Sequence, residues 1–156
     1  MAKAPDYQLP PDIANFADRY QEPLSRLIGN RMRQVGVPDE MIGVEWWGVG
    51  KGPFVRYHPP QLGGNIRVGS NGNPGINVDP AVFDANAPKV GKLPSWRSAS
   101  LRDRIDAAIA HEYAEALAPQ GVDFHIHAIK NAENTSLKIS DRARQILKEY
   151  RQAEGY

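Results

Sequence analysis

The stretch that most constrains how this chain folds is a bounded helical segment, LRDRIDAAIAHEYAEALA, at about 101–118. Ser100 directly precedes it and can cap its first turn. Asp103 lies in that turn, where the positive end of a helix stabilises a carboxylate. Pro119 follows the segment, and the residue before a proline is disfavoured in the helical conformation. The sequence therefore predicts one long helix over about 101–118.

The N-terminal region is expected to form helices as well. Apolar residues recur at helical spacing from residue 13 onward, and Pro23 is disfavoured inside a helix. We therefore expect a break just before Pro23 and a second helix that begins there. The arginines of this second helix, Arg26, Arg31 and Arg33, are expected to face solvent.

The middle of the chain has the pattern of short strands separated by turn residues. Glycine-containing turns, one of them Asn71-Gly72, divide the strands in pairs, which is typical of β-hairpins. The sequence thus predicts a small antiparallel sheet of hairpins over about 42–79. The predicted strands lie within 41–50, 53–58, 65–69 and 75–79.

The C-terminal region predicts a last helix over about 141–151, with Ser140 as its N-cap. Together with the hairpins, these helices predict an α+β fold. Its length suits a single domain, 1–156, in which the polar, proline-rich residues 1–10 form a flexible tail. Such a domain is also compatible with being one module of a longer protein.

Composition excludes several kinds of site. The chain has no cysteine, so it has no disulfide, and His, Asp or Glu must bind any metal. A net charge of +1 gives no strong electrostatic argument for nucleic-acid binding. No apolar run approaches the length of a membrane span, so we expect none.

The 101–118 helix carries ionisable groups in its sequence IAHEYAE, at 109–115. Glu112 falls near the middle of the apolar arc, where a carboxylate is costly unless it is paired, protonated or bound to a cation. His111 and Glu115 are four residues apart and therefore lie one turn apart at the border of that arc. Two donors at this spacing converge on one metal ion in H-E-x-x-H sites, where the glutamate between them activates water.

The segment FHIH offers a third ligand. In an extended segment, His125 and His127 point to the same side, and the turn before them returns the chain to the helix end. We therefore expect His111, Glu115 and His125 or His127 to bind a divalent metal such as Zn²⁺, with Glu112 as the base. His58 lies in a different part of the chain, and nothing requires it at this site.

Three other interpretations remain open. His111 and Glu115 can form a surface ion pair without further chemistry. His111 and Glu112 can perform metal-free acid–base catalysis on a nucleic acid, with Trp96 stacking on a base and Arg97 and Arg102 contacting phosphates. A non-catalytic binding module would instead pair Glu112 with an arginine and leave the histidines scattered.

The blocks IAHEYAEALAP and FHIHAIKNAENTSLKISDRARQILKEY, within about 109–150, resemble C-terminal domains of bacterial polymorphic toxins of the rearrangement-hotspot type. The resemblance implies a secreted or delivered effector that acts in a target cell and is countered by an immunity protein. Outside that role, a cytoplasmic location is expected. The resemblance also places the active site at His111, Glu112, Glu115 and one of the histidines His125 and His127.

The sequence therefore favours an enzyme, a toxin-like and metal-assisted hydrolase that acts on a macromolecule, protein or nucleic acid. The glutamate at position 115 departs from H-E-x-x-H peptidases. The His-Glu pair lies on a long helix, which departs from histidine-rich toxin nucleases, whose paired histidines lie on a ββα element. A peptidase similar to zincins and a nuclease both remain open, as does the metal-independent nuclease.

Overall fold

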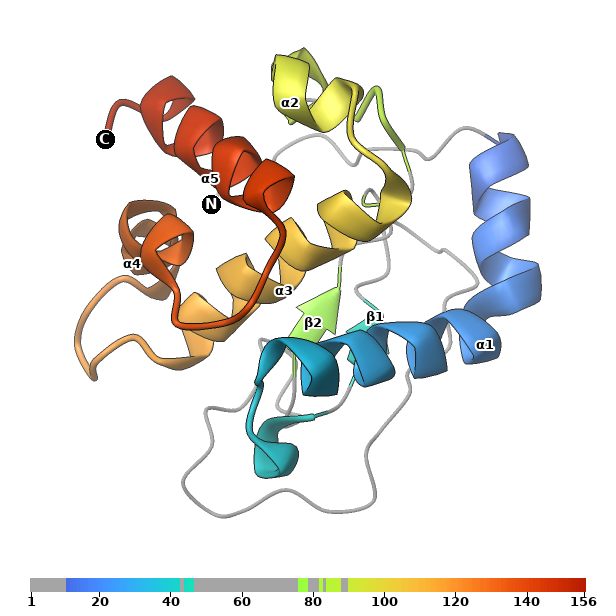
Figure 1. Cartoon of the computed structure of the whole chain (residues 1–156), viewed down its shortest axis with the longest axis horizontal. Coiled ribbons are helices and arrows are strands. Elements are labelled where there is room, and N and C mark those ends of the chain that lie inside the picture. The colour runs from blue at the N-terminus through green and yellow to red at the C-terminus, as the bar shows by residue number, and fades with distance from the viewer. Residues whose placement is uncertain (1–10, 43, 47–75, 79–81, 83, 88–89) are drawn as a thin grey trace, which may run out of the picture.

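A computed structural model describes residues 11–42, 44–46, 76–78, 82, 84–87 and 90–156 of the chain. These residues are mostly helical (Figure 1). The helices are α1 (Pro11–Val35), α2 (Pro94–Arg97), α3 (Leu101–Ala116), α4 (Phe124–Asn131) and α5 (Asp141–Ala153), with short 3₁₀ helices η1 (Asp39–Met41), η3 (Val90–Lys92) and η4 (Ala132–Asn134). The strands are β1 (Val44–Trp46) and β2 (Ile76–Val78).

The predicted α+β fold with an antiparallel sheet of hairpins is wrong. The two described strands have three residues each and pair in parallel, with Val44 opposite Ile76 and Trp46 opposite Val78. A hairpin joins antiparallel neighbours, so this parallel pair is not a hairpin. The predicted strands at 53–58 and 65–69 lie outside the described residues.

The N-terminal helices are one element, not two. α1 continues through Pro23, and Figure 1 shows that it changes direction along its length. A proline removes one backbone hydrogen bond and crowds the preceding turn, which bends a helix when packing favours its continuation. Ile28, Met32 and Val35, near the end of this helix, are buried in the core.

α3 lies at the centre of the described structure, as Figure 1 shows, with α4 and α5 on one side and α1 and the strands on the other. Ser100 caps it by accepting a hydrogen bond from the Asp103 backbone at 3.1 Å, as predicted. Four consecutive residues, 104–107, are buried, so this helix is enclosed on every side along one turn. The largest fully buried side chains of the described residues are Ile28, Met32, Ile109, Leu137, Ile146, Val35 and Asp106.

Asp106 is the one carboxylate in that buried set, and three donors satisfy it. Arg31 of α1 donates to both of its oxygens, from Nε at 2.7 Å and from Nη2 at 2.8 Å. The backbone N–H of Ser140, the N-cap of α5, donates to Oδ2 at 2.9 Å. Arg31 was expected to face solvent, but this bidentate pairing turns it inward and leaves its side chain 16% exposed.

None of the described helices is both long enough and apolar enough to cross a membrane. The expectation of no membrane span agrees with this finding.

Replacing Asp106 with asparagine is expected to lower the free energy of unfolding by about 3–5 kcal/mol, because the change leaves Arg31 charged and without its buried partner. Urea unfolding at neutral pH measures the loss. Asp103→Asn, one turn away on the same helix and half-exposed, is the matched control and should cost less than about 1 kcal/mol. Equal losses in the two variants would contradict a central role for Asp106.

Candidate metal centre

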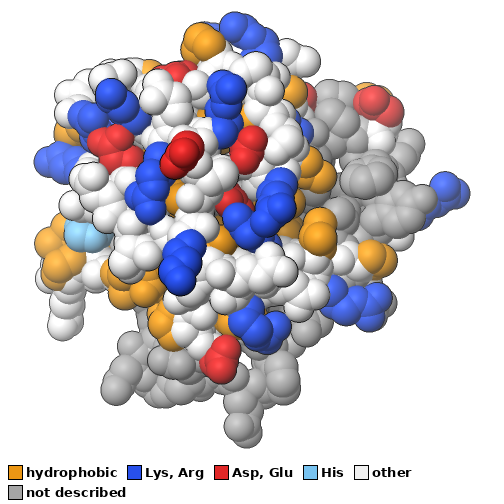
Figure 2. Space-filling view, in the orientation of Figure 1, with side chains coloured by type: hydrophobic (Ala, Val, Ile, Leu, Met, Phe, Trp, Pro, Cys, Tyr) orange, Lys and Arg blue, Asp and Glu red, His pale blue; other side chains and the backbone are white. Residues whose placement is uncertain are grey.

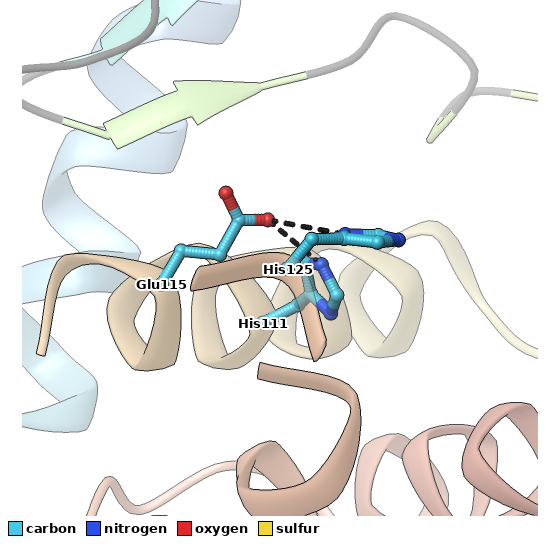
Figure 3. Close-up of side chains that lie close together, drawn as sticks. All are labelled: His111, Glu115 and His125. Atoms are coloured by element: carbon cyan, nitrogen blue, oxygen red, sulfur yellow. Dashed lines mark ion pairs between the residues drawn. The ribbon is translucent and has the colours of Figure 1, made fainter. Parts of the chain in front are cut away.

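Three side chains from α3 and α4 converge at the C-terminal end of α3 (Figure 3). His111 Nε2 lies 2.9 Å from Glu115 Oε2, and His125 Nδ1 lies 3.8 Å from the same oxygen. One ligand atom from each residue lies within 4.8 Å of the others. The structure thus brings together two imidazoles and a carboxylate from two consecutive helices.

The spacing of these atoms is close to that of a metal site. Zinc binds nitrogen and oxygen at about 2.0–2.2 Å in tetrahedral geometry, which places neighbouring ligand atoms about 3.4 Å apart. The separations of 2.9 and 3.8 Å from the Glu115 oxygen lie on either side of that value. Side-chain movements of about 1 Å are enough to bind an ion, and rotamer adjustments of that size are ordinary.

Exposure differs among the three donors. The side chains of His111 and Glu115 are 16% and 17% exposed, whereas that of His125 is 52% exposed. The donor group therefore opens to solvent on the His125 side. Three protein ligands with one open position are the arrangement of catalytic zinc sites, whereas structural sites have four protein ligands.

The predicted extended conformation of FHIH is wrong, since these residues begin α4. The Asp123 side chain caps this helix by accepting from the Ile126 backbone at 3.0 Å, and its buried residues are Ala128 and Ile129. Residues two apart on a helix point about 200° apart. His125 consequently joins the donor group, while the His127 carbonyl accepts a hydrogen bond from the Asn131 side chain at 2.8 Å.

Glu112 follows His111 directly on α3 and is not a member of the donor group. It is half-buried, so it does not occupy the centre of the core as the helical wheel predicted. The prediction for Glu112 is wrong because α3 is enclosed on several sides, so its buried residues do not form a single apolar arc. Three residues along a helix correspond to a rotation of about 60°, so Glu112 is next to Glu115 on the helix surface.

The proposed base-stacking residue is not available for that role. Trp96 is 6% exposed, and its indole N–H donates to the Asp84 carbonyl at 3.0 Å. Arg97 and Arg102 are exposed, but Arg102 lies nine residues before His111, or about 14 Å along α3. Figure 2 shows Lys and Arg side chains spread over the visible face with acidic side chains among them. The described structure therefore does not bring these residues together with His111.

A residue that the sequence did not indicate, Tyr150 of α5, borders the donor group. Its ring centroid lies 6.0 Å from that of His111 at an interplanar angle of 66°. Burial, together with the carboxylates of Glu154 and Glu115, raises the pKa of Tyr150 to about 12. A hydrogen bond with the Glu154 side chain contributes to this rise in the pKa. The phenol is thus neutral at physiological pH. Its place on the apolar face of α5 was the available signal.

No protein-family model matches this sequence, and no curated protein or solved structure matches it either. The resemblance of residues 109–150 to polymorphic toxin domains therefore stays a prediction.

The raised pKa of Tyr150 predicts a loss of stability in alkali. Between about pH 10 and pH 12, the unfolded chain releases the phenolic proton while the folded chain retains it, so raising the pH favours unfolding. Below about pH 10 both states are protonated, and the stabilisation is complete. Urea unfolding between about pH 9 and pH 11.5 should therefore show a steeper loss for the wild type than for Tyr150→Phe, and parallel losses would contradict the assignment.

Proposed function

We propose that this protein is a metal-assisted hydrolase whose divalent ion, such as Zn²⁺, is bound by His111, Glu115 and His125. The single observation that carries the proposal is the convergence of these three donors within 4.8 Å of one another. Imidazole and carboxylate are ligands that zinc accepts, and the chain has no thiol to compete with them. A surface ion pair between His111 and Glu115 alone does not account for His125.

In the proposed reaction, the metal ligands and Glu112 have separate roles. His111, Glu115 and His125 would hold a divalent ion, which would lower the pKa of a water and polarise the scissile carbonyl or phosphoryl group. Glu112, next to Glu115 on α3, takes the proton of the attacking water and returns it to the leaving group. The open His125 side admits the substrate. Peptide bonds suit this arrangement by analogy with zincins, while a nuclease uses the same groups on a phosphodiester.

The resemblance over 109–150 supports a more specific role, a delivered bacterial effector whose action is blocked by an immunity protein. Its hydrolase site would then act on a macromolecule of the target cell. This role predicts that the domain harms a bacterium that expresses it in its cytoplasm.

Metal content tests the ligand assignment. Protein purified without a nickel column and supplied with Zn²⁺ should retain about one equivalent after gel filtration. His111→Ala and His125→Ala should each lose it, because two donors bind zinc far more weakly than three. His127→Ala is the matched control and should keep the metal, since His127 lies on another side of α4. A wild type that binds no metal, or equal loss in the control, would contradict the assignment.

Glu112→Gln tests the proposed base. The amide is nearly isosteric but does not accept a proton, so turnover should fall about 10²- to 10⁴-fold with zinc retained. Casein and single-stranded RNA serve as protein and nucleic-acid probes for the Zn²⁺-loaded domain, and colony formation on induced expression serves as the cellular measurement. A folded, zinc-loaded Glu112→Gln with wild-type activity would exclude this glutamate as the base. If the loaded wild type cleaves neither probe and leaves growth unchanged, the hydrolase proposal is wrong.

A further inference from the structure

The His111 ring lies in contact with two other rings. His125 approaches it with a centroid separation of 5.3 Å and an interplanar angle of 68°. Tyr150 approaches it at 6.0 Å and 66°. Both are edge-to-face arrangements, in which the positive edge of one ring faces the negative face of the other. His111 therefore has aromatic contacts from α4 and from α5.

These two neighbours are not equivalent. His125 is a donor of the proposed site, and its side chain is 52% exposed, so it is free to move when an ion binds. Tyr150 is half-buried on α5. α5 packs against both α3 and α4, so Tyr150 is held by the body of the domain. Of the two, Tyr150 is the fixed contact.

We propose that Tyr150 is a positioning residue of the metal site, which orients the His111 ring toward Glu115 before the ion binds. This inference rests on the proposed function, because it concerns the same site. Outer partners that orient a ligating histidine typically contribute 10- to 100-fold to metal affinity. Most such partners accept a hydrogen bond from the imidazole, whereas Tyr150 restricts the ring by packing.

The consequence is an order of assembly. His111 and Glu115 are already 2.9 Å apart and largely buried, so they form a preorganised pair of donors. The exposed His125 then completes the group. Binding to a preorganised pair costs less side-chain entropy than ordering three mobile donors. Without the Tyr150 ring, His111 would be ordered only when the ion binds, and the loss of its side-chain entropy would then weaken binding.

Two substitutions of Tyr150 separate packing from hydrogen bonding. Tyr150→Leu removes the ring and should weaken Zn²⁺ binding about 10- to 100-fold, measured by competition with a chromophoric chelator. Tyr150→Phe keeps the ring, so its Zn²⁺ affinity should stay within about 3-fold of that of the wild type; it serves as the conservative rescue. Tyr113→Leu is the matched control, since Tyr113 is half-buried on α3 and points about 200° away from His111.

The visible spectrum of bound Co²⁺ provides a measurement that simple destabilisation does not change, because its bands report ligand geometry. Tyr150→Leu should alter these bands, whereas Tyr113→Leu and Tyr150→Phe should not. Wild-type affinity and spectrum in a folded Tyr150→Leu would overturn the inference while leaving the metal site intact. Failure of the wild type to bind either metal would overturn the proposed function and this inference together.

Nuclear magnetic resonance of the metal-free wild type provides a test that needs no variant, in case Tyr150→Leu does not fold. The His111 ring should show one rotamer, with contacts to the Tyr150 ring, before any metal is added. A rotamer-averaged His111 ring in the metal-free protein would overturn the inference.

Discussion

The described structure depends on the buried carboxylate of Asp106. A helix that is enclosed on every side, as α3 is over 104–107, has nowhere to place a charged side chain except against partners inside the protein. Arg31 and the Ser140 backbone are those partners, and they belong to α1 and to the start of α5. One side chain therefore fixes two elements that are far apart in the sequence. Since α5 carries Tyr150, this polar contact also determines what lies beside the candidate metal centre.

Local signals in the sequence predicted local structure. Ser100 and Ser140 both cap helices, and each accepts a hydrogen bond at 3.1 Å from the backbone three residues later. The apolar face of the last helix is buried at Ala143, Ile146 and Leu147. Long-range contacts had no such signal. The pairing of β1 with β2 joins segments about thirty residues apart, and the partner of Arg31 is 75 positions away.

In the candidate site, too, local spacing was predictable from the sequence and long-range contacts were not. The spacing of His111 and Glu115 follows from helical periodicity, so it needed no tertiary information. Choosing between His125 and His127 required the conformation of FHIH. Apolar residues and histidines alternate over these four positions, a pattern that favours a strand. The signals for a helix were Asp123, a residue type that caps helices, and the apolar pair Ala128 and Ile129 that follows it; the structure shows the cap formed and the pair buried. The contact with Tyr150 required the packing of α5, which no local pattern specifies.

The locality of the donors has a consequence for folding. His111 and Glu115 lie on α3 and His125 lies at the start of α4, after a short turn, whereas the Tyr150 ring that contacts His111 comes from α5. Closing so short a loop has a small entropic cost, so a helical hairpin of α3 and α4 can bring the donors together early in folding. The donors can therefore meet through local contacts, whereas the contact of Tyr150 with His111 forms later, with the long-range pairing that closes the domain around Asp106.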